Sequence, residues 1–61
     1  MFKNGFRFEI TKNGNIGEIT GVSTTGIYSV VFFDKYGMYL RADVTEGTIR
    51  NKLEAGVFKA L

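Results

Sequence analysis

The sequence predicts a mainly β domain: a small five-stranded antiparallel barrel with one short helix before the last strand. Three observations support this fold class. Short segments rich in Ile, Val, Phe, Tyr and Thr alternate with turns marked by Gly and Asn. The chain has 61 residues, which allows one small domain over residues 1–61. Near the end of the chain, the spacing of apolar residues changes from that of a strand to that of a helix.

The first predicted hairpin starts with a strand over residues 6–10. Apolar and polar residues alternate there, which is the period of a strand with one buried face. Asn13-Gly14 follows, and it is the strongest two-residue hairpin signal, because a type I′ turn requires positive φ at both positions. A return strand over about 16–22 then sets Glu9 opposite Glu18, a like-charge pair that costs a little stability.

The second predicted hairpin spans residues 27–44 and contains the most apolar stretch of the chain. Residues 34–37 form its turn, with Asp first and Gly last, as a type I turn favours. A four-residue turn pairs Phe33 with Met38 and sorts the hairpin into two faces. The face predicted to form core carries Ile27, Ser29, Val31, Phe33, Met38, Leu40, Ala42 and Val44. The other face is aromatic and carries Tyr28, Val30, Phe32, Tyr39, Arg41 and Asp43.

The remaining residues predict a short helix and a last strand. Thr45 can cap the helix, because its hydroxyl can accept a bond from a free N–H of the first turn. Ile49 and Leu53 are four residues apart and therefore share one helix face. Gly56 is a natural end for the helix. Residues 57–61 then form a strand that returns to the sheet.

This order of elements resembles an SH3-like small barrel over nearly the whole chain. The resemblance rests on element order and length, without a diagnostic motif, so it implies a fold and not a function. A rival fold is an open, strongly twisted antiparallel sheet with the helix packed on one face. Both folds place the same residues in the core: Phe6, Phe8, Ile19, Val31, Leu40, Leu53 and Phe58.

The composition lacks the residue types that most catalytic mechanisms require. The sequence has no His and no Cys, so it lacks an imidazole base, a thiolate nucleophile and the common transition-metal ligands. Glu9 and Glu18 could act as an acid–base pair across the first hairpin, but solvated surface carboxylates are far more common. We expect no enzymatic activity, no catalytic residue, no cofactor and no metal site.

Charge and hydropathy predict a soluble intracellular protein. Eight Lys and Arg residues against six Asp and Glu give a net charge of +2, and the basic residues are scattered singly. The longest stretch without a charge, residues 19–33, contains several Gly, Ser and Thr residues and is no membrane span. We expect no membrane partner, no signal peptide, and a cytoplasmic location in a bacterial or phage-infected host cell.

The aromatic face of the 27–44 hairpin is the candidate binding surface. The chain has six Phe and three Tyr, more than one small core needs, and Tyr and Arg dominate interface hot spots. We expect a homodimer that binds a host protein through Tyr28, Val30, Phe32, Tyr36, Tyr39 and Arg41. In size and in its lack of catalytic residues, the chain is similar to accessory proteins with which phages and plasmids inhibit or modulate host machinery, including host defence components.

Two other interpretations use the same face. A nucleic-acid-binding barrel would stack bases on the aromatic residues and contact phosphates through Lys35, Arg41 and Lys52. Alternatively, the helix or the N-terminal segment covers part of the face and leaves no binding surface there. The sequence leaves open which face of the hairpin is exposed and whether the ligand is a protein or a nucleic acid.

Overall fold

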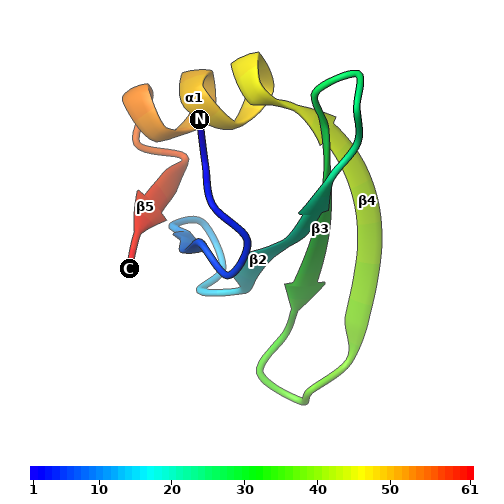
Figure 1. Cartoon of the computed structure of the whole chain (residues 1–61). Coiled ribbons are helices and arrows are strands. Elements are labelled where there is room, and N and C mark those ends of the chain that lie inside the picture. The colour runs from blue at the N-terminus through cyan, green and yellow to red at the C-terminus, as the bar shows by residue number, and fades with distance from the viewer.

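A computed structural model describes all residues of the chain, 1–61, and shows one antiparallel sheet with a short helix. Its strands are β1 (Arg7–Ile10), β2 (Ile16–Val22), β3 (Ile27–Phe33), β4 (Tyr39–Thr45) and β5 (Phe58–Ala60), with the helix α1 (Glu46–Glu54) before β5 (Figure 1). The strand order is β4-β3-β2-β1-β5. The predicted mainly β class and the helix before the last strand are therefore confirmed. β4 and β5 remain as the two edges of the sheet, which does not close.

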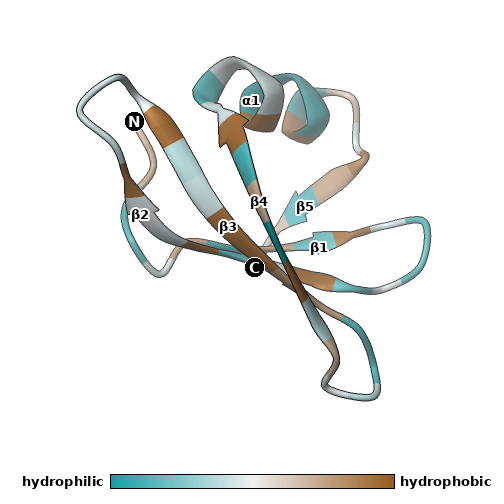
Figure 2. Cartoon of the chain, turned by 90° about the vertical axis from the view of Figure 1, so that its right-hand side faces the viewer, coloured by the Kyte–Doolittle hydropathy of each residue, from teal (hydrophilic) through white to brown (hydrophobic).

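The sheet bends around an aromatic core. The Phe8 ring stacks on the Phe58 ring with 4.3 Å between centroids, and Phe32 meets Phe8 edge-on at 6.0 Å. Phe58 also lies 6.4 Å from Phe32, although β2 and β1 separate their strands in the sheet. In Figures 1 and 2 the sheet accordingly bends so that β5 and α1 lie on the same side of β3. The buried core consists of Phe8, Ile19, Tyr28, Val30, Ile49 and Phe58.

Gly17 in β2 makes this close packing possible. It lies directly opposite Phe8 in the sheet. A Cβ atom at Gly17 would lie 2.3 and 2.4 Å from two atoms of the Phe8 ring, far inside van der Waals contact. Phe8 is completely buried and stacked on Phe58, so its ring has no free space to move into. Only glycine fits at this position.

The first hairpin pairs two residues away from the predicted register. Phe8 lies opposite Gly17, and Arg7 lies opposite Glu18. The predicted contact between Glu9 and Glu18 is therefore wrong. Arg7 Nε instead lies 3.0 Å from Glu18 Oε1, so a repulsive pair is replaced by an ion pair. Because the shift is an even number of residues, each side chain keeps its predicted face.

The loop of this hairpin explains the shift. The predicted type I′ turn is wrong, because Gly14 has a φ of 78° while Asn13 has no positive φ. The Gly14 N–H donates to the Ile10 carbonyl at 2.8 Å, which makes the loop longer than two residues. Thr11 is held from the other side, since its N–H donates to the Val57 carbonyl at 3.0 Å. Contacts with the turn before β5 thus set the loop length.

The second hairpin pairs one residue away from the predicted register. The Asp34 N–H donates to the Met38 carbonyl at 2.9 Å and closes a three-residue loop that ends at Gly37. Gly37 has a φ of 81° and is therefore left-handed. In three-residue hairpin loops, a left-handed residue of this kind follows the type I turn. Phe33 therefore pairs with Tyr39 rather than with Met38.

This shift of one residue turns β4 over relative to β3. Val31, predicted to be core, lies half-buried on the outer face of the sheet. Leu40, also predicted to be core, is 69% exposed at one end of the inner face. Of the other predicted core residues, three are buried and two are half-buried against them: Phe8, Ile19 and Phe58, then Phe6 and Leu53. The inner face of the hairpin carries Tyr28, Val30, Phe32, Leu40, Ala42 and Val44.

The helix forms as predicted. Thr45 is its N-cap, and the Thr45 hydroxyl accepts the N–H of Thr48 at 3.2 Å. Ile49 is fully buried and Leu53 packs against the core. Gly56 follows the helix with a φ of 77°, a left-handed conformation that ends helices. No helix of this structure has the length and apolar character required to cross a membrane.

Candidate binding surface

The structure covers three of the six residues predicted to form the binding surface. Tyr28 is 1% exposed and Val30 is fully buried, while Phe32 packs half-buried against the same core. The prediction that these residues are exposed is therefore wrong. The physical reason is cover from distant parts of the chain: the Phe2 ring meets the Tyr28 ring, and Ile49 of α1 belongs to the same buried cluster as Tyr28 and Val30.

The Tyr28 hydroxyl joins three segments of the chain at one end of the sheet. It accepts the N–H of Phe2 at 3.1 Å and donates to Glu46 Oε1 at 3.1 Å. The Phe2 ring also meets the Tyr28 ring edge-on at 5.9 Å. The Glu46 carboxylate in turn bonds Arg50 one helical turn further along α1. The N-terminal segment and α1 thus close this end of the inner face.

The other three predicted residues stay exposed. Tyr36 in the turn is 79% exposed, Tyr39 in β4 is 66% exposed, and Arg41 is also exposed. Met38 and Leu40 are each 69% exposed beside them, although the sequence had assigned both to the core. Gly37 was the signal that could have revealed this, because a left-handed glycine at the end of the turn is typical of a three-residue loop, not of the predicted four-residue turn. We call Tyr36, Met38, Tyr39 and Leu40 the hairpin-tip patch.

The turn that carries the hairpin-tip patch is held by Asp34. Its carboxylate accepts the N–H of Tyr36 at 2.9 Å and the N–H of Met38 at 3.0 Å. The Gly37 N–H donates to the Asp34 carbonyl at 3.1 Å. The ammonium group of Lys35 lies 5.2 Å from the centre of the Tyr36 ring, within cation–π range. The patch is thus presented on an ordered turn.

A shallow hollow of about 210 Å³ lies beside the hairpin-tip patch. This volume is below the roughly 300–1,000 Å³ of typical small-molecule pockets. It is large enough for one side chain of another protein. Four of its six lining residues are hydrophobic, and the full lining is Asn15, Phe32, Asp34, Met38, Tyr39 and Leu40.

The outer face of the sheet extends the hairpin-tip patch. Ile16, Phe33 and Tyr39 lie side by side on β2, β3 and β4. The Phe33 and Tyr39 rings are 6.3 Å apart, and Ile16 and Phe33 are half-buried. The apolar surface therefore continues from the turn across three strands.

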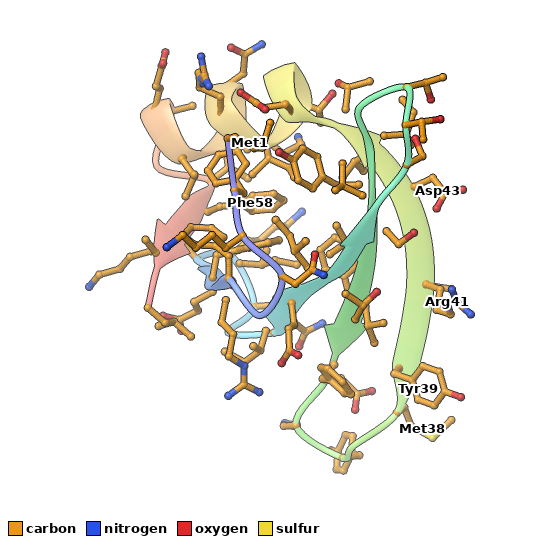
Figure 3. The ribbon with its side chains drawn as sticks, viewed as in Figure 1. Met1, Met38, Tyr39, Arg41, Asp43 and Phe58 are labelled. Carbon is orange, nitrogen blue, oxygen red and sulfur yellow. The ribbon has the colours of Figure 1, made fainter.

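The three basic residues predicted to contact nucleic acid lie apart. Lys35 is in the turn between β3 and β4, and Lys52 is on α1, at the opposite end of the molecule (Figure 1). Lys52 instead sits 5.9 Å from the centre of the Phe58 ring. Arg41 projects from β4, with Asp43 two residues further along the strand (Figure 3). These residues do not form one basic groove.

Neither the carboxylates of the chain nor its comparison with known proteins assigns a function to this surface. Glu9 and Glu18, which were considered as an acid–base pair, have other cross-strand partners, Ile16 for Glu9 and Arg7 for Glu18. No group of three or more Asp and Glu residues gathers as a set of metal ligands. Comparisons with protein-family models, with curated protein sequences and with solved structures find no match.

Proposed function

We propose that this chain is a non-enzymatic, homodimeric binding protein whose hairpin-tip patch contacts a host protein. One observation supports this above all: four large apolar side chains, each at least 66% exposed, gather at the turn end of the hairpin, with Tyr39 on the outer face of the sheet and Leu40 on the inner face. Single exposed apolar residues are normal on proteins, whereas a group of them marks an interaction surface. Tyr and Met are also enriched at protein interfaces.

The charges around the hairpin-tip patch favour a partner with an acidic rim. Lys35 and Arg41 flank the patch and are exposed. The nearest carboxylate, Asp34, is engaged by two backbone N–H groups of the turn. An apolar side chain of the partner would occupy the hollow, and a carboxylate beside it would meet Lys35. Such charges mainly direct association and fix orientation.

The proposal extends to the class of fold and of protein. The strand order supports an SH3-like assignment, since β5 returns to pair with β1 and α1 separates the last two strands. We place the protein in the cytoplasm of a bacterial or phage-infected cell. There it acts as an accessory protein of a phage or mobile element that inhibits or modulates a host protein, such as a defence component. The small size and the lack of His and Cys support this class.

Affinity capture from host extract tests the protein-binding proposal. The variant Tyr36→Ser/Met38→Ser removes two side chains of the hairpin-tip patch without touching β3 or β4. Leu61→Ser is the matched control, because Leu61 is 67% exposed but lies at the other edge of the sheet. We expect one host protein to bind the wild type and the control equally, and the tip variant at least about tenfold more weakly, a loss of about 1.4 kcal/mol. Equal capture by all three would contradict the proposal.

A salt titration separates a protein ligand from a nucleic acid. Contacts with phosphates release counterions, so their affinity falls steeply as salt rises and is greatest at low salt. We expect no binding of single- or double-stranded DNA or RNA at low salt. Tight binding that weakens steeply with salt and depends on Arg41 would overturn the protein partner in favour of nucleic acid.

A further inference from the structure

β4 is a long sheet edge whose charged residues are Arg41 and Asp43. It stands at one end of the strand order, and seven residue pairs join it to β3 without a bulge. The chain has no Pro, and β4 contains no Lys. Natural sheets usually protect such an edge from pairing with a bulge, a Pro, a Lys or a very short strand. The other edge strand here, β5, has only three residues.

The hydrogen bonds show which residues of β4 have backbone N–H and C=O groups that point away from β3, toward the open edge. The Asp34 N–H bonds the Met38 carbonyl at 2.9 Å, in the same register as β3 and β4. Bonded and non-bonded pairs alternate along an antiparallel ladder, so the even-numbered residues of β4 bond to β3. The backbone N–H and C=O groups that point outward therefore belong to Tyr39, Arg41 and Asp43.

We propose that two copies of this chain pair antiparallel through their β4 edges, about a two-fold axis at Ala42. The two sheets then continue as one. This inference supplies the interface of the homodimer in the proposed function, and it rests on that function only for the existence of a dimer. It replaces the aromatic face that the sequence had suggested for self-association, because Tyr28 and Val30 on that face are already buried within one chain.

The charges of β4 select this register. Residues whose backbone groups point outward must oppose each other, which requires the two-fold axis to pass through a residue of β4 and not between two residues. An axis at Arg41 sets that residue against its own copy, and an axis at Asp43 does the same for the carboxylate. Only the axis at Ala42 sets Arg41 opposite Asp43 of the second copy, and symmetry makes this pair twice. Opposite charges directly across two strands stabilise the pairing, and like charges oppose it.

The same register also matches the apolar residues of β4. Leu40 lies opposite Val44 of the second copy, and both belong to the inner face. Leu40, which is 69% exposed in one chain, thereby gains an apolar neighbour. Neither Arg41 nor Asp43 forms an ion pair within its own chain. Figure 3 shows both side chains projecting from β4 away from the body of the molecule, where a second strand can reach them.

Charge reversal tests the register directly. Arg41→Asp places two acids on β4, and Asp43→Arg places two bases there, so each variant repels its own copy. A mixture of the two restores both opposite-charge pairs, and so does the double variant Arg41→Asp/Asp43→Arg. Sedimentation should show the wild type and the double variant at twice the 6.8 kDa chain mass. Each single variant should dimerise at least about tenfold more weakly, and the equimolar mixture should form the heterodimer.

Amide hydrogen exchange locates the interface independently of the variants. The N–H groups of Arg41 and Asp43 should become protected as protein concentration rises, whereas the Ala42 N–H, bonded to β3, stays equally protected throughout. A monomer at every concentration would overturn the proposal. So would single variants that dimerise like the wild type, a mixture that stays monomeric, or unprotected Arg41 and Asp43 amides in the dimer.

The dimer and the binding of a host protein can fail separately. Tyr36→Ser/Met38→Ser leaves every residue of β4 in place, so it should dimerise like the wild type while losing the host protein. If this variant loses the host protein and keeps the dimer, the result supports host binding through the hairpin-tip patch and leaves the β4 interface unaffected. Loss of the dimer in Asp43→Arg, which leaves the hairpin-tip patch and Arg41 in place, concerns the β4 edge.

Discussion

The two ends of the β3–β4 hairpin differ in what covers them. At the α1 end, Tyr28 is buried under the N-terminal segment and the helix, and its hydroxyl bonds both Phe2 and Glu46. At the turn end, Tyr36 and Leu40 project with more than two-thirds of their surface exposed. The residue types are similar, but the strands that could cover the turn end are short, since β1 has four residues and β5 has three.

This difference separates stability from binding. The aromatic core and the hydrogen bonds at the α1 end hold the fold, so changes there should unfold the chain. The hairpin-tip patch contributes little to the fold, so changes there should affect partners alone. A chain of this size is stabilised by only about 3–9 kcal/mol, at about 0.05–0.15 kcal/mol per residue, which makes each loss at the α1 end measurable.

The largest expected effect is at the packing of β2 against Phe8. Gly17→Ala places a Cβ atom 2.3 Å from a ring that is fully buried, so β2 or the ring must shift. We expect a loss of about 3 kcal/mol in the free energy of unfolding, measured by urea denaturation. Gly21→Ala in the same strand is the matched control, because nothing lies within 4 Å of its Cβ position. Equal stability of both variants would mean that Phe8 does not pack on Gly17.

The next effect compares the two ends of the hairpin by removing one tyrosine hydroxyl from each and measuring the free energy of unfolding. Tyr28→Phe deletes a hydroxyl and leaves the Phe2 N–H and a Glu46 oxygen without that partner. We expect it to cost about 1–2 kcal/mol by urea denaturation. Tyr36→Phe deletes the same atom from a side chain that is 79% exposed and should change stability by less than about 0.5 kcal/mol. Similar losses for both would erase the difference between the ends.

A smaller effect is expected at the start of α1. Thr45→Ala removes the hydroxyl that accepts the Thr48 N–H, and helix N-caps contribute about 1 kcal/mol. The melting temperature should fall by about 4–8 °C. Thr45→Ser, which keeps the hydroxyl, should lose much less. An unchanged melting temperature in Thr45→Ala would show that the helix contributes little to closing this end.

The sequence was sufficient for the elements and insufficient for the register between them. Local signals predicted the strands, the Thr45 cap and the end of the helix at Gly56, because caps and turns depend on neighbouring residues. The faces of β3 and β4 depended on one residue in the loop. Gly37 in a left-handed conformation shortened the loop to three residues and turned β4 over.

The candidate site was predicted in part for the same reason. Tyr36, Tyr39 and Arg41 are exposed as expected, since turn and outer-face positions hold them. Tyr28 and Val30 are buried because Phe2 and α1 cover them, contacts that join residues far apart in the sequence. Such contacts leave no local pattern, so no periodicity in the 27–44 segment could reveal which face they cover.

The free energy of unfolding of Tyr36→Ser/Met38→Ser tests most directly whether the hairpin-tip patch is a free surface. It should be measured by urea denaturation at low protein concentration, where self-association adds least. Both side chains are at least 69% exposed, so the variant should remain within about 0.5 kcal/mol of the wild type. A loss of about 2 kcal/mol or more would show that these residues pack within the fold, and would contradict the separation of binding from stability.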